Sequence, residues 1–414
     1  MGKRWVLGID SGGTKAIGLL VSEDGTVAGV GFGGPTNQYF VAAEDALVSL
    51  RRVIRQAVDM AEGRGYPLPL ADPTDPAGAE DEGQADSSTS SSWQSRGQPH
   101  EQAHEIAPAT PPTSEATSRI RLDAAYLSAP GLSKEVALTA LRERFVVHPV
   151  ALADDAEAAF VGALPGGEGA IALAGTGSFA YARRDGQVVV KGGWGPLLGD
   201  EGSGYWIALE ALKAVIRAYE HRGPPTSLAE ALQATLRYSF PEELRRLVYG
   251  AQMTRHRLAG LAMLVSQEAA SGDAVAQQIL QQAGQELGAL AVSAARELSW
   301  PGQCPVSLTG GVARAGQWVQ EAFRRTVKEA LPQSVWVEPA YAPCVGAALL
   351  ALRLAQVPIV PSLLKRLEAS LYEGFRPFLP MMMRSGAALS SANLTRIGEA
   401  ETGLATGTTA EGKA

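Results

Sequence analysis

The segment Asp10-Ser-Gly-Gly-Thr-Lys15 has the residue types of a turn that binds phosphate. Glycine lets backbone N–H groups approach an anion closely, and a threonine hydroxyl adds a donor. The candidate phosphate ligands are Gly12, Gly13, Thr14 and Lys15. Asp10, which ends the preceding strand-like run, is of the type that holds Mg²⁺ directly or through water. The segment is not a Walker A loop, and a hairpin turn that binds nothing is the alternative.

A second segment, Gly175-Thr-Gly-Ser178, has the same character in the second half of the chain. It offers backbone N–H groups and two hydroxyls, so Thr176 and Gly177 are candidate ligands as well. Two such turns can hold one triphosphate from both sides, as two domains that close over ATP require. The pair Gly310-Gly311 suggests a close backbone approach to adenine or ribose, although a plain turn has the same sequence.

Two adjacent carboxylates, Asp154 and Asp155, follow the apolar run 146–152 and open a helix. A carboxylate at such a helix start can accept the proton of a hydroxyl during phosphoryl transfer. A structural role is also open, because Asp154 and Glu157 have the spacing of a capping box. The pattern alone does not choose between the two carboxylates.

The stretch Gly192–Trp206 concentrates glycine, tryptophan and carboxylates in a loop before a helix. Such a loop suits polyol recognition, because an aromatic ring meets the apolar face of a sugar and carboxylates accept its hydroxyls. The alternative is that Asp200 or Ser203 caps the helix and that Trp194 and Trp206 are core residues.

Two further patterns carry no function. His100-Glu-Gln-Ala-His104 matches the zincin pattern, but that motif needs a stable helix, and here it lies in a low-complexity region between prolines. Asn393-Leu-Thr395 fits a glycosylation sequon, but nothing in the sequence indicates secretion.

The elements that must position these residues repeat once along the chain. Residues 4–34 have the pattern of three strands, with a glycine turn after the first and Asp24-Gly25 as a hairpin turn before the last. Residues 170–193 repeat this order and again end in two glycines. The repeat predicts a duplicated α/β unit whose two glycine turns face one cleft, with chance similarity of two hairpins as the alternative.

Apolar periodicity predicts the remaining elements. Other strands are expected at 120–128, 146–152 and 306–309. Helices are expected at 42–61, 133–144, 155–164, 203–221, 226–238, 241–250, 254–271, 273–298, 315–330 and 344–355.

Length and composition indicate a globular protein of two domains, since 414 residues exceed one hydrophobic core. We expect an N-terminal lobe over 1–156, in which 67–118 is a disordered low-complexity insertion, because Pro, Ser, Thr, Glu, Gln and Gly replace apolar periodicity there. A larger C-terminal lobe is expected over 157–379, with its last helix packing back on the first lobe, and a flexible tail over 380–414.

Charge and cysteine content exclude several classes of function. A net charge of −7 argues against nucleic acid as the main partner. No apolar run approaches the roughly 18 residues of a membrane span, and Asp10 interrupts the first apolar stretch before it could act as a signal peptide. We therefore expect a cytoplasmic protein without a membrane partner. Two cysteines, Cys304 and Cys344, exclude a disulfide framework and a four-cysteine zinc site.

Together these motifs resemble those of the N-acetylglucosamine kinases and of the family that they share with activator ATPases of benzoyl-CoA reductase and 2-hydroxyacyl-CoA dehydratase, within the sugar kinase/Hsp70/actin superfamily. The resemblance covers nearly all of the chain except 67–118 and the tail, and its most specific part is 192–203. It implies a two-lobed α/β fold of the actin-like ATPase (ribonuclease H-like) type. A duplicated mixed-sheet core and ATP and sugar in an interlobe cleft are also implied.

The same resemblance implies an ATP-dependent amino-sugar kinase that acts on the 6-hydroxyl of N-acetylglucosamine or a close relative, such as glucosamine or N-acetylmuramic acid. ATP and Mg²⁺ would be required, with Asp10 near the metal and Asp155 as catalytic base. Thr14 and Thr176 would contact the phosphates, and Gly310-Gly311 the adenosine. The implied sugar contacts are Asn37, Asp155, Gly193, Trp194 and Asp200. A homodimer is favoured, and the segment Leu127–Gly131 departs from the family's glycine-richer loop, which leaves the choice of sugar open.

Two other functions are weighed against this one. An activator ATPase would couple hydrolysis to electron transfer through an Fe–S cluster, but the positions of Cys304 and Cys344 do not resemble that cysteine arrangement. A sugar-responsive regulator would carry an upstream helix-turn-helix and a zinc cysteine cluster, whereas here the first strand is expected from residue 4.

Overall fold

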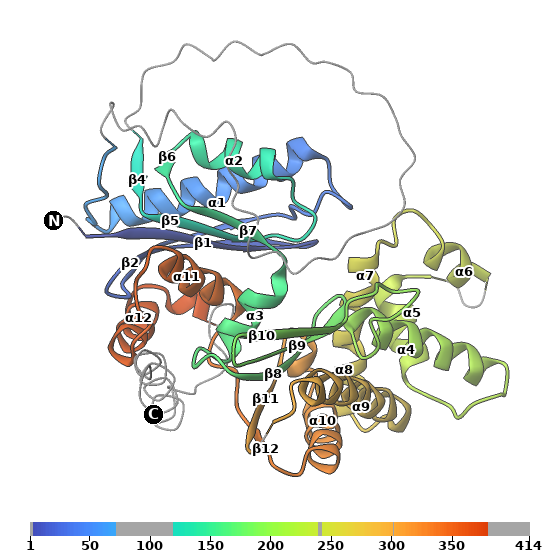
Figure 1. Cartoon of the computed structure of the whole chain (residues 1–414). Coiled ribbons are helices and arrows are strands. Elements are labelled where there is room, and N and C mark those ends of the chain that lie inside the picture. Colours follow the sequence, from blue (N-terminus) through green and yellow to red (C-terminus); the bar gives the residue numbers. More distant parts are fainter. Residues whose placement is uncertain (1–2, 72–118, 239–241, 301, 380–414) are drawn as a thin grey trace, which may run out of the picture.

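The computed structural model describes residues 3–71, 119–238, 242–300 and 302–379 (Figure 1). Two five-stranded sheets dominate it, and Figure 1 shows the helix α3 (Asp155–Ala163) lying between them. Each sheet is covered by helices, so the chain forms an α/β protein with two lobes.

The first sheet has the strand order β3-β2-β1-β5-β7. The strands β1, β2 and β3 form an antiparallel meander, and β5 and β7 run parallel to β1. Asp24-Gly25 forms the predicted turn, with Gly25 at φ +87°. The bounds are β1 (Trp5–Ser11), β2 (Ala16–Ser22), β3 (Val27–Gly33), β5 (Ala124–Ser128) and β7 (Val150–Ala153). A separate two-stranded sheet pairs β4 (Ile120–Leu122) with β6 (Phe145–Val147).

The second sheet repeats this plan with the order β10-β9-β8-β11-β12. Again three consecutive strands form an antiparallel meander and two later strands run parallel to the first of them. The bounds are β8 (Gly169–Ala174), β9 (Ser178–Arg184), β10 (Gln187–Gly192), β11 (Cys304–Thr309) and β12 (Ser334–Trp336). The predicted duplication of a mixed-sheet core is confirmed.

Helices cover both faces of the first sheet. In Figure 1, α1 (Ala43–Gly63) and α2 (Lys134–Arg142) lie on one face, and α11 (Pro343–Leu354) and α12 (Pro361–Gly374) lie on the other. Because both faces are buried, β1 is almost continuously apolar rather than alternating. The last part of the chain therefore packs on the N-terminal sheet.

The remaining helices belong to the second half of the chain, where Ala-rich β8 packs into one core with α4, α8 and α9. Their bounds are α4 (Gly204–Tyr219), α5 (Leu228–Leu236), α6 (Glu242–Val248), α7 (Arg255–Gly260), α8 (Ala262–Ala270), α9 (Ala274–Glu297) and α10 (Gln317–Ala330). Two short 3₁₀ helices complete the list, η2 (Val312–Arg314) and η3 (Arg376–Phe378).

A single hydrophobic core joins the two lobes. It contains Val6 of β1, Phe160 of α3, Tyr181 of β9 and Val345 of α11. The rings of Phe160 and Tyr181 lie 4.9 Å apart, centroid to centroid. At the same junction Glu157 of α3 accepts a hydrogen bond from the Tyr126 hydroxyl (3.1 Å) and pairs with Arg183 of β9 (3.8 Å). The helix α3 therefore contacts both sheets.

Several predicted elements need correction. The strand expected at 146–152 is two strands, because Pro149 has no N–H to donate; β6 ends before it and β7 begins after it. The strand expected at 120–128 is also divided, at Asp123, whose carboxylate accepts the Trp5 N–H (2.8 Å). The helix expected at 254–271 is divided into α7 and α8, while β12 and α12 were not predicted.

The insertion predicted at 67–118, the two histidines of the zincin-like pattern, the sequon and the tail at 380–414 lie wholly or mostly outside the described residues. Of the insertion, residues 67–71 are described, and Leu70 forms an isolated antiparallel bridge with Ile120. Among the helices of the described ranges, none combines the length and apolar character that crossing a membrane demands.

Close backbone approach between α3 and α11 gives a test of this architecture. A Cβ at Gly346 of α11 would lie 1.9 Å from the carbonyl oxygen of Ala158. We expect Gly346→Ala to lower the free energy of unfolding by about 1–3 kcal/mol, because the two helices must separate. Urea denaturation measures this. Gly63→Ala, in open space at the end of α1, is the control and should be neutral or slightly stabilising. Equal stabilities for the two variants would contradict the packing.

Candidate functional site

Three parallel neighbours in the first sheet end at one edge. In the register of the sheet, Asp10 of β1 lies opposite Ser128 of β5, and Ser128 lies opposite Ala153 of β7. Asp155 is the first residue of α3, two positions after β7 ends. The strand order thus brings residues from three distant segments to the carboxyl edge of the sheet, where open α/β sheets bind their ligands.

The two carboxylates at this edge interact. Burial raises the pKa of Asp10 to about 7, with the negative charge of Asp155 as the second cause, while Lys15 and a long hydrogen bond from Ser128 (3.4 Å) oppose the shift. Burial and the neighbouring charge of Asp154 raise the pKa of Asp155 to about 6. Two carboxylates withdrawn from water and close to each other favour a cation or an ionisable proton between them.

The first glycine turn joins β1 to β2. The Gly12 N–H donates to the Lys15 carbonyl (3.1 Å), and the Thr36 N–H donates to the Gly12 carbonyl (3.0 Å). Gly13, Thr14 and Lys15 are exposed. Hydrogen bonds therefore fix the ends of the turn, and its middle residues face solvent. Binding of a phosphate group requires this arrangement.

The second glycine turn joins β8 to β9 in the equivalent place. The Gly175 N–H donates to the Gly177 carbonyl (2.9 Å), and the Gly204 N–H at the start of α4 donates to the Gly175 carbonyl (2.8 Å). Gly310 follows β11, the parallel neighbour of β8, and a Cβ on it would lie 2.2 Å from the Ala174 carbonyl oxygen. The predicted ligands Thr176, Gly177, Gly310 and Gly311 thus come from the ends of two adjacent strands.

The fold requires glycine at some positions of these turns and not at others. Gly310 has φ +95° and no room for a side chain, so the backbone itself requires glycine there. Gly12 and Gly175 lie outside the left-handed region, and a Cβ on either would meet nothing within 4 Å. The fold does not require glycine at these two positions, and the space beside them is open.

The predicted sugar residues lie in two groups. In the first lobe, Asn37 is buried, and its Oδ1 accepts the Tyr39 N–H (2.9 Å). A Cβ at Gly131 would lie 2.5 Å from that oxygen, so the loops of Asn37 and Gly131 are packed together. In the second lobe, Trp194 is 56% exposed rather than part of the core, and the Gly193 N–H donates to the Ser178 carbonyl (3.0 Å).

Asp200 is held more tightly than a free acceptor would be. It is 3% exposed and adopts φ +63°. Its Oδ1 accepts the Ser178 N–H (3.1 Å), and its Oδ2 is paired with Arg255 of α7. Sequence motifs did not include Arg255, because it lies 55 positions away in a helix without unusual composition.

The structure also shows which side chains cap the helices α3 and α4. Asp154 occupies the N-cap of α3 but its side chain makes no capping bond, and Glu157 contacts Tyr126 and Arg183 instead, so the capping-box prediction is wrong. Ser203 caps α4 by accepting the Trp206 N–H (3.2 Å), so the helix does not need Asp200 for that purpose.

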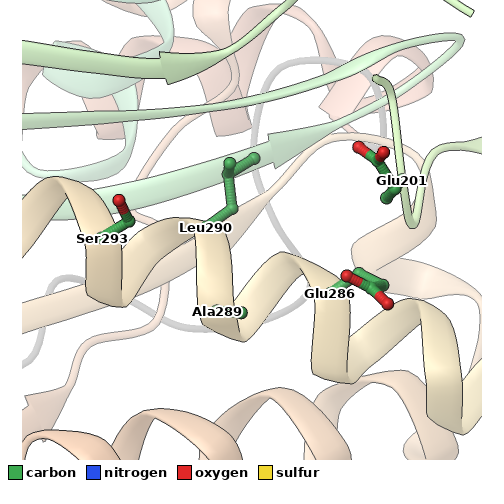
Figure 2. A pocket seen from close by; sticks show the side chains of 5 residues that line it. All are labelled: Glu201, Glu286, Ala289, Leu290 and Ser293. Atoms are coloured by element: carbon green, nitrogen blue, oxygen red, sulfur yellow. The ribbon is translucent and has the colours of Figure 1, made fainter. Parts of the chain in front are cut away.

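Two surface hollows lie along α9. One of about 240 Å³ is lined by Glu201, Glu286, Ala289, Leu290 and Ser293, and Figure 2 shows that Glu201 comes from a loop and the others from one side of the helix. The second, of about 400 Å³, extends along the same helix toward α10. No residue predicted for ATP or sugar lines either hollow.

A family model for the BadF/BadG/BcrA/BcrD ATPase family matches residues 7–351, a range that contains both glycine turns and both carboxylates. The chain belongs to this family. The ATPase name of the family agrees with the prediction that the two glycine turns bind phosphate.

Two curated relatives resemble this member of the BadF/BadG/BcrA/BcrD family over part of their length. One is the N-acetylmuramic acid/N-acetylglucosamine kinase of Clostridium acetobutylicum, 33% identical over 178 residues, which are 42% of this chain and 58% of the relative. The other is the N-acetyl-D-glucosamine kinase of Dictyostelium discoideum, 32% identical over 188 residues, 44% of this chain and 59% of the relative. The matches thus span somewhat more than half of each relative.

Solved structures support the fold. A candidate N-acetylglucosamine kinase from Chromobacterium violaceum superposes with a TM-score of 0.55 at 22% identity, covering 85% of this chain and 99% of that one. A second candidate, from Porphyromonas gingivalis, gives 0.53 at 15% identity, with 84% and 98% covered. These similarities confirm the expected two-lobed, actin-like α/β fold for this family member.

The unneeded glycines give a test of the nucleotide site. We expect Gly12→Ala and Gly175→Ala to leave the free energy of unfolding unchanged or raised by up to about 1 kcal/mol. Each should weaken binding of a magnesium–ATP analogue about tenfold, because the new methyl group occupies the approach of the phosphates. Isothermal titration calorimetry measures this, with Gly302→Ala, also in open space, as the control. Unchanged affinity in both variants would remove the turns from the site.

Proposed function

We propose that this chain is an ATP-dependent amino-sugar kinase that phosphorylates the 6-hydroxyl of N-acetylglucosamine or a close relative, such as glucosamine or N-acetylmuramic acid. The observation that carries the proposal is the position of Asp155, a half-buried carboxylate at the sheet edge that also holds Asp10. Two glycine turns at equivalent strand ends, and the names of the two kinase relatives, support the same chemistry.

In this mechanism the protein mainly positions the reactants and neutralises charge. Asp155 accepts the proton of the attacking sugar hydroxyl. Its raised pKa of about 6 leaves it ionised at neutral pH yet more basic than an ordinary aspartate. Backbone N–H groups of the two turns, with Thr14 and Thr176, bind the phosphates, and Gly310-Gly311 approach the adenosine.

The residues at the first sheet edge fit Mg²⁺. Asp10 supplies the oxygen ligand that Mg²⁺ prefers. Burial and then the charge of Asp155 raise its pKa to about 7, and a bound cation would lower it again. The described residues contain no cluster of three or more metal-ligating side chains. In the proposed site one carboxylate, water and phosphate oxygens would hold the metal, which would neutralise charge on the phosphates.

The sugar would lie between the two groups of predicted contacts. Asn37 belongs to the first lobe, and Gly193, Trp194 and Asp200 belong to the second. Exposed Trp194 offers an aromatic face to the apolar side of a sugar ring. Asp200 can accept a hydroxyl while keeping its bonds to the protein, because a carboxylate has about four acceptor positions.

An activator ATPase is the alternative within the family. Both Cys304 and Cys344 are buried and unpaired, and burial raises each pKa to about 12. Thiolates for a shared Fe–S cluster would need exposure and a depressed pKa. The cysteine environment therefore favours the kinase.

Three further features remain proposals, the first from the family resemblance and the other two from the sequence. These are a homodimer, a cytoplasmic location and a division into lobes near residue 156. The position of α3 between the sheets supports that division, and α11 and α12 would then belong with the first lobe by packing.

Asp155 can be tested against its neighbour. We expect Asp155→Asn to lower kcat by roughly 10²–10⁴ with little change in ATP affinity, because the proton acceptor is lost while the phosphate turns remain. Asp154→Asn is the matched control, since that side chain is exposed and makes no capping bond, and it should stay within a few-fold of wild type. A coupled ATP-consumption assay measures both. If Asp154→Asn lost the activity and Asp155→Asn kept it, the assignment of Asp155 as proton acceptor would be wrong.

The substrate class is tested by the same assay on a panel of hexoses and amino sugars. N-acetylglucosamine or a close relative should give turnover, and product analysis should place the phosphate on the 6-hydroxyl. If ATP were hydrolysed at the same rate without any sugar, and no sugar were phosphorylated, the kinase proposal would be wrong.

The role of Asp10 predicts a metal dependence. Chelation of Mg²⁺ should abolish turnover, and Asp10→Asn should raise the Mg²⁺ concentration for half-maximal rate about tenfold or more, because one charged ligand is lost. A Mg²⁺ titration of the initial rate measures this. An unchanged requirement in the variant would place the metal elsewhere.

A further inference from the structure

Arg255 lies at the start of α7 and reaches the second glycine turn. The Thr254 side chain caps this helix by accepting the Arg257 N–H (3.3 Å), which fixes the direction in which the first turn points. Asp200, the partner of Arg255, lies in the loop before α4. The two segments are far apart in the sequence and meet only in the fold.

Asp200 links two parts of the site through its two carboxylate oxygens. Oδ1 accepts the backbone N–H of Ser178, the residue that closes the glycine turn, and Oδ2 is bound by Arg255. The Ser178 hydroxyl donates in turn to the Glu201 carbonyl (2.7 Å). Because Asp200 is 3% exposed, its charge depends on the arginine rather than on water.

The guanidinium also lies against the turn itself. A Cβ at Gly177 would be 2.6 Å from Nη2 of Arg255 and 2.8 Å from Oδ1 of Asp200. The ion pair therefore occupies the space that a side chain at position 177 would need. The absence of a side chain at Gly177 is explained by the pair, whereas Gly175 in the same turn faces open space.

One donor of the arginine is still unused. The Nε of Arg255 is buried and has no hydrogen-bond partner among the described residues, although the side chain as a whole is 28% exposed. The pair with Asp200 is therefore the link between Arg255 and the turn.

We propose that Arg255 is a positioning residue of the nucleotide site, which holds the second glycine turn in its phosphate-binding shape through Asp200. The nucleotide part of this assignment rests on the ATPase family and on the geometry of the turn. A second part rests on the proposed function: because Asp200 is also a proposed sugar contact, the same ion pair joins the sugar-side loop to the phosphate turn.

The test is calorimetric binding of magnesium AMPPNP, a non-hydrolysable ATP analogue, to the full chain and its variants. Arg255→Gln should raise the Kd about tenfold. Asp200 would lose the positive charge beside it and would no longer hold the second glycine turn in place. Arg255→Lys keeps the charge without the planar fork and should weaken binding only about threefold. Arg257→Gln, two positions along α7, changes an exposed arginine that bonds the Gln252 carbonyl (2.9 Å), and should bind as wild type.

A double variant separates positioning from general destabilisation. If Arg255 acts through Asp200, Arg255→Gln combined with Asp200→Asn should weaken nucleotide binding no more than Asp200→Asn alone. Additive losses would overturn the proposal, and so would a Kd for Arg255→Gln within twofold of wild type. If circular dichroism shows that Arg255→Gln does not fold, Arg255→Lys decides, and a Kd equal to that of wild type overturns the assignment.

Sugar turnover distinguishes this inference from the kinase proposal. Should Arg255→Gln lose nucleotide affinity while the wild type phosphorylates no amino sugar, Arg255 keeps its place in the nucleotide site and the kinase proposal falls. Should the wild type phosphorylate N-acetylglucosamine while Arg255→Gln keeps wild-type Kd and KM values, the assignment of Arg255 falls and the kinase proposal stands.

Discussion

The partial burial of two carboxylates, Asp10 and Asp155, at one edge of the first sheet is the constraint on which the proposed site depends. Asp10 and Asp155 come from different segments, yet Asp155 contributes to a pKa of about 7 at Asp10. Such a pair is unfavourable by itself and persists only where the surrounding structure holds both groups in place. Positive charge beside the two carboxylates favours their ionised forms, and the proposed phosphoryl transfer would bring such a charge with the metal.

The frame that holds the pair is the duplicated sheet together with α3. Parallel strands β1, β5 and β7 end at one edge, and α3 begins there before it continues into the shared core between the lobes. The second sheet repeats the same order, so its glycine turn occupies the place that corresponds to the first. Glu157, bonded to Tyr126 on one side and Arg183 on the other, ties both sheets to the helix that carries Asp155. The placement of Asp155 and the packing between the lobes therefore both depend on one short helix.

The glycine turns and the duplicated fold could be predicted from local sequence patterns. The glycine turns were found because strands and hairpin signals flank them, and the duplication followed from their repeated order. The predictions that were wrong or incomplete mostly concern contacts between segments that are distant in the sequence. The capping box at Asp154 was wrong because Glu157 has better partners across the lobe junction. Arg255 was missed because nothing near it in the sequence shows that α7 meets the loop of Asp200, and Pro149 was overlooked as a strand break.

The central claim is that both glycine turns bind the phosphates of one nucleotide and that Asp155 contacts the sugar bound beside it. A crystal structure of the chain with magnesium AMPPNP and N-acetylglucosamine tests it most directly. The account predicts phosphate oxygens within about 3.2 Å of backbone N–H groups in both turns. It also predicts the sugar 6-hydroxyl within about 2.6–3.2 Å of Asp155. Phosphates bound away from either turn, or a different hydroxyl facing Asp155, would contradict it.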